Sequence, residues 1–597
     1  MGESQPKKKP EQSEIKKLRA QAKQGVLRAQ YLVAVNLVQL GEPKDLQEAE
    51  KWYRKAAKRK FPPAQNNLGL LLAGEKLGKP NPKEAVKWFR QAADAGNAQA
   101  QWNLAGHLRR GEGVEENQED AFEWTQKAAE QGVPIALNRL GICYAEGIGV
   151  EKDETKAVGS FRDAAEKGLP AGCYNLAVRL RDGQGCAKDE DAAREFFTQA
   201  AKQELISAQN ALAVMCAAGL GGDHDEPAAT EWYRQAAEAG DATAQNNYAT
   251  RLADGLGVET NIAEAMIWYE RAAEQGCVPA QYNLGRRKLE GDGVPAQPRV
   301  ALSWLEKAAI GEHTEAQYLF ARALDSGTGV PPNQIMAMRW YRAAAEGGKP
   351  EAQYSLAVSL ERGEGCKPDE AEAANWYTLA ADAGHASSQF NLGIMYLQGR
   401  GVLADDRKAV TYFKKAAEQA VASAQCNLGA MYERGRGAEQ NDAAAVRWYT
   451  LAAEQGLARA QYNLAVMLHT GRGVETNVAE AVTWYRQAAK QGHASAQFVL
   501  ASLYHHGEGV EASDQEAAKW YQYAAAQDVP EAQLVLADCY LRGRGVPEDY
   551  VLAHVWFNRA ASHGIDVAEK YKRHAERCMT PDQIAQAQAM LRHHMAA

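Results

Sequence analysis

Residue types that could do enzymatic chemistry are present, but not at catalytic spacings. No Cys-x-x-Cys pair, His-Glu-x-x-His motif or phosphate-loop Lys motif occurs in the 597 residues, so the spacings that bind zinc or phosphate are missing. Ser-x-x-Lys occurs only at Ser4–Lys7 and Ser13–Lys16, without the companion motifs of a Ser–Lys enzyme. Gly-x-Gly recurs thirteen times, but after predicted helices, which argues against dinucleotide binding. The sequence predicts no enzyme, no cofactor and no small-molecule substrate.

The histidines do not form a metal site in the sequence pattern. His313, His385 and His493 occupy the same position of different repeats, so they are predicted to lie too far apart to bind one ion. The adjacent pairs His505-His506 and His593-His594 are predicted to be solvent-exposed. We therefore expect no bound metal.

The composition limits the classes of partner and the cellular location that we expect for the protein. The 68 Lys and Arg against 76 Asp and Glu leave a formal charge of −8, without the basic excess typical of nucleic-acid binding. No run approaches the ~18 apolar residues of a transmembrane helix. The nine Cys are scattered without a repeated pair, and Met1 to Lys17 lacks the apolar core of a secretory signal. These features favour a cytoplasmic protein with reduced thiols, and Lys7-Lys8-Lys9 are too few to predict an acidic target surface.

One set of polar residues has the regularity that binding would need. Asn recurs at one position in eight units, and this set is called the Asn row. Its carboxamides offer donors and an acceptor, so they could pair with the main chain of an extended peptide. The alternative is that each Asn bonds a neighbouring helix and fixes the repeat geometry; the sequence leaves both open. The row consists of Asn67, Asn103, Asn175, Asn247, Asn283, Asn391, Asn427 and Asn463.

A second position, seven residues after the Asn row, varies in charge. All of its acidic members lie before residue 300. Arg110 is the one arginine in that part, and Arg362, Arg434 and Arg542 follow residue 360. This pattern suggests a groove with an acidic first half and a basic second half, or a solvated face with chance ordering. This second row reads Arg110, Glu146, Asp182, Ala218, Asp254, Glu290, Ser326, Arg362, Gln398, Arg434, Thr470, His506 and Arg542.

The elements that carry both rows come from an internal repeat. Twelve of the 13 Trp, from Trp52 to Trp556, are separated by multiples of 36 residues, which indicates a repeat array. In residues 460–495, apolar residues at helical spacing predict two helices separated by Gly471-Arg472-Gly473. Asn477 is the predicted N-cap of the second helix, with Glu480 completing a capping box. At a wheel angle of about 100° per residue, both rows lie beside the core face of the first helix.

Two features recur in all fifteen units, and a third recurs in fourteen. An Ala precedes the aromatic anchor, which is usually Trp, by three residues, and an Ala-Ala pair follows it. The cap position is Asp, Asn or Ser in fourteen units, beginning with Asp45, and Gln297 is the exception. Where Ser160 replaces Trp, the neighbouring Phe161 is predicted to keep an aromatic ring in that layer.

The pattern A-Q-Y-N-L-G/A, G-x-G-V and A-x-x-W-Y-x-x-A-A-x-x-G resembles the Sel-one-like repeat, a relative of the tetratricopeptide repeat. The ending Met579-Thr580-Pro581-Asp582-Gln583-Ile584 is similar to that of many bacterial members. The resemblance implies an all-α, right-handed superhelical solenoid of about fifteen 36-residue helix-turn-helix repeats that binds other proteins.

We expect a disordered basic tail at 1–12, an N-terminal capping helix at 13–28, the solenoid at 29–565 and C-terminal capping helices at 566–597. The expected function is a protein-interaction scaffold or adaptor that binds a protein or peptide along a concave groove. The Asn row with Arg362, Arg434 and Arg542 is its candidate site. The alternative is an exported factor that engages host or extracellular protein.

Overall fold

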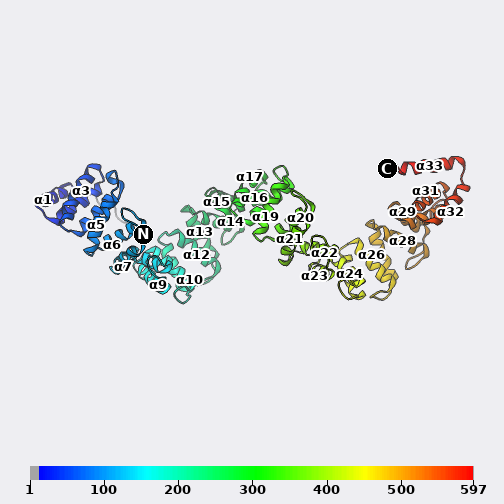
Figure 1. The fold of residues 1–597 in the computed structure, drawn as a ribbon, viewed down its shortest axis with the longest axis horizontal. Helices are drawn as coiled ribbons and strands as arrows, with labels where there is room; N and C mark the ends of the chain where they lie inside the picture. The colour runs from blue at the N-terminus through cyan, green and yellow to red at the C-terminus, as the bar shows by residue number, and fades with distance from the viewer. Residues whose placement is uncertain (1–11, 596–597) are drawn as a thin grey trace. The chain divides into compact units, whose positions relative to one another are not determined.

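The computed structural model describes residues 12–595, in which every regular element is helical (Figure 1). The chain divides into two compact units, Met1–Ala296 (unit 1) and Gln297–Ala597 (unit 2). Residues 1–11 of the predicted tail, with Lys7-Lys8-Lys9, lie outside the described residues. Each repeat is a hairpin of two helices, here called its A helix and its B helix.

Unit 1 begins with α1 (Gln12–Lys23), which packs against α2. Its A helices are α2 (Leu27–Leu40), α4 (Pro62–Ala73), α6 (Ala98–Arg110), α8 (Pro134–Glu146), α10 (Pro170–Asp182), α12 (Ile206–Ala218), α14 (Ala242–Asp254) and α16 (Val278–Glu290). Its B helices are α3 (Pro43–Lys58), α5 (Pro82–Asp94), α7 (Gln118–Glu130), α9 (Glu154–Glu166), α11 (Glu190–Ala201), α13 (Glu226–Glu238) and α15 (Ile262–Glu274), and a short 3-10 helix, η1 (Glu75–Leu77), follows α4.

Unit 2 has the same alternation. Its B helices are α17 (Pro298–Ile310), α19 (Gln334–Glu346), α21 (Glu370–Asp382), α23 (Asp406–Glu418), α25 (Asp442–Glu454), α27 (Val478–Lys490), α29 (Asp514–Ala526) and α31 (Tyr550–Ser562). Its A helices are α18 (Thr314–Ser326), α20 (Pro350–Arg362), α22 (Ala386–Gln398), α24 (Ala422–Arg434), α26 (Ala458–Thr470), α28 (Ala494–His506) and α30 (Pro530–Arg542). After α32 (Asp566–Arg577), α33 (Pro581–Met595) packs on α31, where Val551, Val555 and Ala587 are buried.

The Gly-x-Gly turn closes each regular hairpin. Gly471 ends α26 in the left-handed conformation with φ 68°, which glycine adopts without steric cost. A side chain on Gly473 would overlap the main chain of Asp442 at the start of the preceding B helix. The two glycines are therefore required by the geometry of the turn between the helices, which explains their recurrence without dinucleotide binding.

The predicted N-caps are confirmed in thirteen B helices, where the side chain accepts from the backbone N–H three residues later. Gln297 makes no such bond. The assignment of Asp45 is wrong: α3 begins at Pro43 after Glu42, so Asp45 lies within its first turn. The predicted capping box also differs, because the backbone N–H of Asn477 donates to Leu468 O and the Glu480 carboxylate accepts from the Asn477 side chain.

The side chain that fills the core of each repeat is not the predicted Trp but the residue that follows it. Of the twelve Trp in register only Trp52 and Trp520 are fully buried, and the rest are half-buried. The residue after the Trp position is buried in all fifteen repeats and aromatic in thirteen. Phe161 is one of these residues and does not substitute for the missing Trp. The Trp position covers the core, and the next ring, packed between A and B helices, fills it.

Candidate functional site

The Asn row lies along the A helices, and all eight side chains are half-buried. In unit 1 its members are linked by carboxamide hydrogen bonds. Asn66 Nδ2 donates to Asn67 Oδ1 at 3.1 Å, and Asn103 Nδ2 of the next repeat donates to Asn66 Oδ1 at 2.8 Å. The same arrangement recurs from Asn246 to Asn247 and from Asn283 to Asn246, and Asn175 donates to Asn138. These bonds tie consecutive A helices together.

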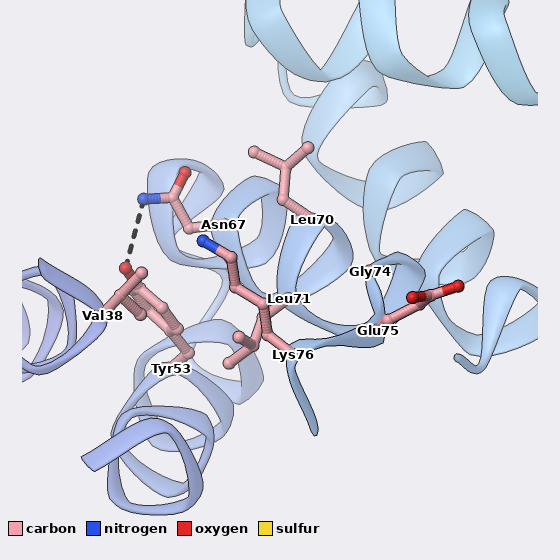
Figure 2. Close-up of a pocket in the computed structure, with 8 residues that line it drawn as sticks. All are labelled: Val38, Tyr53, Asn67, Leu70, Leu71, Gly74, Glu75 and Lys76. Carbon is pink, nitrogen blue, oxygen red and sulfur yellow. Dashed lines mark hydrogen bonds between the residues drawn. The ribbon is translucent and has the colours of Figure 1, made fainter. Parts of the chain in front are cut away.

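Asn67 also contacts two tyrosine hydroxyls. Its Nδ2 lies 3.3 Å from Tyr31 Oη. It also lies 3.4 Å from Tyr53 Oη, the hydrogen bond drawn in Figure 2. Burial raises the pKa of Tyr53 to about 12, against the hydrogen bond with Asn67, which lowers it. Both ends of this carboxamide are therefore engaged within the protein.

In unit 2 the Asn row has other partners. Asn391 Nδ2 donates to Tyr377 Oη at 3.0 Å, and Asn427 Oδ1 accepts from Arg459 at 3.4 Å. Asn463 Nδ2 lies 3.9 Å from Cys426 Sγ. Every member of the row thus has an internal partner, which favours a role in repeat geometry; peptide binding by these residues stays a prediction.

The second row differs from the Asn row because all thirteen of its members are exposed. Arg362 lies 3.6 Å from the Glu364 carboxylate with its side chain 66 % exposed, and Arg542 pairs with Asp538 at 2.6 Å. Arg434 forms no ion pair within residues 12–595. Exposed pairs of this kind contribute at most about 1 kcal/mol, so these guanidiniums are available to a partner at little cost.

A buried glutamine row was missed by the sequence analysis. In thirteen repeats a Gln near the start of the A helix, preceded by Ala in every case except Gln389, donates to a carbonyl near the end of the preceding helix, which is α1 for Gln30 and a B helix for the others. Gln389 Nε2, for example, lies 3.0 Å from Ala381 O, and its Oε1 accepts from Gln419 at 2.8 Å. The last carbonyls of a helix lack regular intrahelical partners; Ala381 O accepts from the Gly384 N–H at 3.1 Å, and Gln389 adds a second donor that ties the next A helix to it. A polar residue recurring on an otherwise apolar face was the available signal.

One pocket on unit 1 is large enough for a side chain of a ligand (Figure 2). It has a volume of about 400 Å³ and opens between α2, α3 and α4. Asn67 and Tyr53 line it with Leu70 and Leu71, and Lys76 stands at its edge. The pocket lies where α4 ends at Ala73 and the chain continues through Gly74 in an extended conformation.

The predicted histidine positions have structural uses. His313, His385 and His493 cap A helices by accepting a backbone N–H at Nδ1, at 3.2–3.3 Å. Nδ1 of His505 lies 2.9 Å from the Asp514 carboxylate; the side chains of the predicted pair at 593–594 lie outside those described. Among the described residues no group of three or more His, Cys, Asp or Glu could hold a metal ion. No helix within that range is long and apolar enough to span a membrane.

The chain matches the Sel1 repeat model fifteen times in succession, over residues 27–61, then in 36-residue steps to 530–565. Comparison with solved structures gives similar folds. A protective antigen present in uropathogenic Escherichia coli strains, displaying an SLR fold, is 30 % identical with a TM-score of 0.59. The alignment covers 80 % of this chain and 94 % of that protein. A Sel1 repeat protein from Oxalobacter formigenes is 33 % identical with a TM-score of 0.43, over 52 % of this chain and 89 % of that one. No curated protein matched the chain.

These matches confirm the predicted resemblance and the all-α array of fifteen helix-turn-helix repeats. Proteins built from these repeats are generally interaction scaffolds, and the fold is typically non-catalytic. Because the repeat model accounts for residues 27–565 and a 30 % identical relative aligns along most of its length, the chain belongs to the Sel1 repeat family.

Proposed function

We propose that the protein is a non-enzymatic scaffold or adaptor that holds a segment of another protein along its A helices. Contacts come from the second row, and the Asn row supports the face that carries it. The observation that carries the proposal is the difference in exposure: the Asn row is half-buried with internal partners, whereas every member of the second row is exposed. Variable exposed side chains at one position of a repeat array are suited to specific recognition.

The charge of the second row differs between the two units. In unit 1 the second row carries Glu146, Asp182, Asp254 and Glu290, and in unit 2 it carries Arg362, Arg434 and Arg542. A partner segment with basic residues would be complementary to the second row of unit 1, and a segment with acidic residues to the second row of unit 2. Such complementarity acts on specificity and association rate, and it weakens as salt rises.

The test is cross-linked capture of partners from native lysate by three versions of the full chain. The first is native, the second is R362E/R434E/R542E, and the third is R339E/R407E/R447E. The third variant changes the same net charge on exposed arginines of α19, α23 and α25, which are B helices. A partner captured by the native chain and the B-helix variant, and lost by the second-row variant, supports the proposal. Equal capture by all three contradicts it.

The Asn row is tested in the same assay. Asn391→Ser, Asn427→Ser and Asn463→Ser together remove the carboxamides in unit 2, where the internal partners are a hydroxyl, a guanidinium and a thiol. If the row contacts the partner directly, capture falls while the thermal unfolding midpoint changes little. A lower midpoint with unchanged capture assigns the row to repeat geometry alone.

A cytoplasmic location belongs to the main proposal, and its support is that all nine Cys are free thiols in the structure. The second candidate is an exported factor that engages host protein. It is favoured by the relative described as a protective antigen of uropathogenic strains. Cell fractionation followed by thiol labelling separates the two: nine reactive thiols after unfolding, in the cell fraction, support the first candidate, and recovery from the medium supports the second.

A further inference from the structure

The one basic member of the second row in unit 1, Arg110, is not isolated. Arg109 precedes it in α6, and Arg139 in α8 occupies the Asn-row position of the next repeat. Arg110 makes a bidentate pair with Glu112, Nε to Oε1 at 2.6 Å and Nη2 to Oε2 at 2.9 Å. Within residues 12–595 neither Arg109 nor Arg139 forms an ion pair with a carboxylate.

The surroundings of Arg109 disfavour its positively charged form. Burial, followed by the nearby guanidiniums of Arg139 and Arg110, lowers the pKa of Arg109 below its usual range. Arg139 lies beside the buried thiol of Cys143. Two half-buried guanidiniums without carboxylate partners destabilise the folded chain, because buried charge is costly unless it is paired. An anion placed between them would remove that cost.

A small hollow of mixed lining adjoins Arg109 and Arg110. It has a volume of about 180 Å³ and is lined by the apolar Leu70, Phe89 and Trp102 and by Asn103, Gly106, His107, Arg109 and Arg110. Leu70, which is 48 % exposed, also lines the pocket of Figure 2. The hollow is too small for a typical small-molecule ligand, whose pockets measure about 300–1,000 Å³, but it has room for one apolar side chain.

A missing side chain opens the hollow. Gly106 stands in α6 where later A helices carry Ile142, Val178 and Val214. A Cβ on Gly106 would meet nothing nearer than Arg110 Nη1 at 3.5 Å, an ordinary contact. Neither packing nor the helix therefore requires glycine at this position.

We propose that Arg109 and Arg139, with the hollow at Gly106, form a subsite for a peptide segment of another protein that presents a carboxylate side chain beside an apolar one. The carboxylate pairs with the two guanidiniums and the apolar side chain enters the hollow. Glu146 and Asp182 follow on the next A helices, so a long polyanion such as RNA is repelled beyond this point, whereas a single acidic residue is not. The subsite rests on the proposed function in that it uses the same face.

The test uses fluorescence anisotropy with the full chain and a fluorescein-labelled peptide in which aspartate alternates with leucine. Two control peptides replace every aspartate by lysine or every leucine by serine. We expect saturable binding of the first peptide and at least about tenfold weaker binding of both controls, because charge-assisted hydrogen bonds and the buried side chain both contribute. Equal binding of the aspartate and lysine peptides, or no saturable binding of the first, overturns the proposal.

Variants locate the binding. R109Q/R139Q lowers affinity for the aspartate–leucine peptide about tenfold or more, and Gly106→Val lowers it by filling the hollow. The matched control is Arg181→Gln: Arg181 holds the Arg109 position two repeats later and is paired with Asp182 at 2.7 Å, so this variant keeps native affinity. Native affinity in R109Q/R139Q overturns the subsite.

Thermal unfolding without ligand distinguishes the proposed subsite from a purely structural role of Arg109 and Arg139. Because Arg109 and Arg139 repel each other, R109Q/R139Q should unfold at the same temperature as the native chain or higher, and a clearly lower midpoint overturns the proposal. The two proposals also fail separately. If capture of a cellular partner needs Arg362, Arg434 and Arg542 while the affinity for the peptide does not depend on Arg109 and Arg139, only the subsite is wrong. If the peptide needs Arg109 and Arg139 while capture ignores the second row, only the scaffold proposal is wrong.

Discussion

Units 1 and 2 share one backbone repeat but differ in the polar residues around it. In unit 2, the carboxylates of Glu361 and Glu433 accept hydrogen bonds from Tyr377 and Tyr449 hydroxyls at 2.9 and 2.7 Å. The same carboxylates pair with turn arginines of the next repeat, Arg400 and Arg472, at 2.9 and 3.0 Å. In unit 1 the corresponding hydroxyls of Tyr53 and Tyr269 lie 3.4 Å from the Asn67 carboxamide and 2.9 Å from the Thr250 hydroxyl.

What stays constant between the units is as informative as what changes. The Ala pairs, the residue after the Trp position and the Gln row occur in both units, and all of them are buried except Ala561, which is half-buried. The residues that differ lie at the ends of A helices and in turns, where substitution leaves no cavity and costs little. Selection for a partner can act on these positions without altering the fold, which is why we place binding there.

The largest expected difference concerns the Gln row. Gln389→Leu in unit 2 removes a 3.0 Å bond to Ala381 O and a 2.8 Å bond from Gln419, and should cost about 2 kcal/mol because two hydrogen bonds of about 1 kcal/mol each are lost. Gln209→Leu in unit 1 removes only a 3.5 Å bond, since Gln209 Oε1 has no partner, and should cost about 1 kcal/mol. Hydrogen exchange of α22 and α12 measures the two losses; equal losses would contradict the comparison.

Lowering the pH should reduce the stability of unit 2 where histidines cap its A helices. Burial lowers the pKa of His313, His385 and His493 below the usual value, so the unfolded chain takes up protons first as pH falls. Stability is complete above about pH 6.5 and is lost as pH falls toward the folded-state pKa values, because a protonated Nδ1 cannot accept the helix N–H. Each lost cap costs about 1 kcal/mol.

Unit 1 provides the reference for this pH effect. Asn97 and Asp241 hold the same cap position there, each accepting a backbone N–H at 2.8 Å, and neither is a histidine. Hydrogen exchange at pH 7.5 and 5.5, corrected for intrinsic rates, should show faster exchange at the starts of α18, α22 and α28 but not of α6 and α14. His385→Asn should abolish the change in α22; persistence of the change would refute the cap explanation.

The smallest effect concerns the turn arginines. Arg472→Ala removes pairs with Glu433 at 3.0 Å and Asp442 at 3.1 Å, and should cost about 0.5 kcal/mol, since Arg472 is 40 % exposed. Leu256→Ala changes the same turn position in unit 1, where the side chain is 39 % exposed, and should be close to neutral. Urea unfolding at low salt and at 1 M salt measures both, and a cost for Arg472→Ala that does not shrink with salt would show that packing, not charge, is responsible.

Periodicity made the helical array predictable, because a 36-residue recurrence of Ala, Gly and aromatic residues fits one hairpin repeated along the chain. Caps followed for the same local reason: an Asp, Asn or Ser before a helix bonds a backbone N–H three residues away. The failure at Asp45 is local too, since Pro43 starts α3 earlier than the repeat register predicts.

The amino-acid sequence thus determined the helices, the turns and which residues share an A-helix face, since these depend on spacing along the chain. Only the tertiary structure decided which polar residues are already engaged: Asn67 meets a hydroxyl 36 residues away and Gln389 an amide 30 residues away. It likewise separated the unpaired Arg109 from the paired Arg181. Periodicity places a side chain on a face, but whether its hydrogen-bonding capacity is used depends on neighbouring repeats, and this decides what remains for a partner to bind.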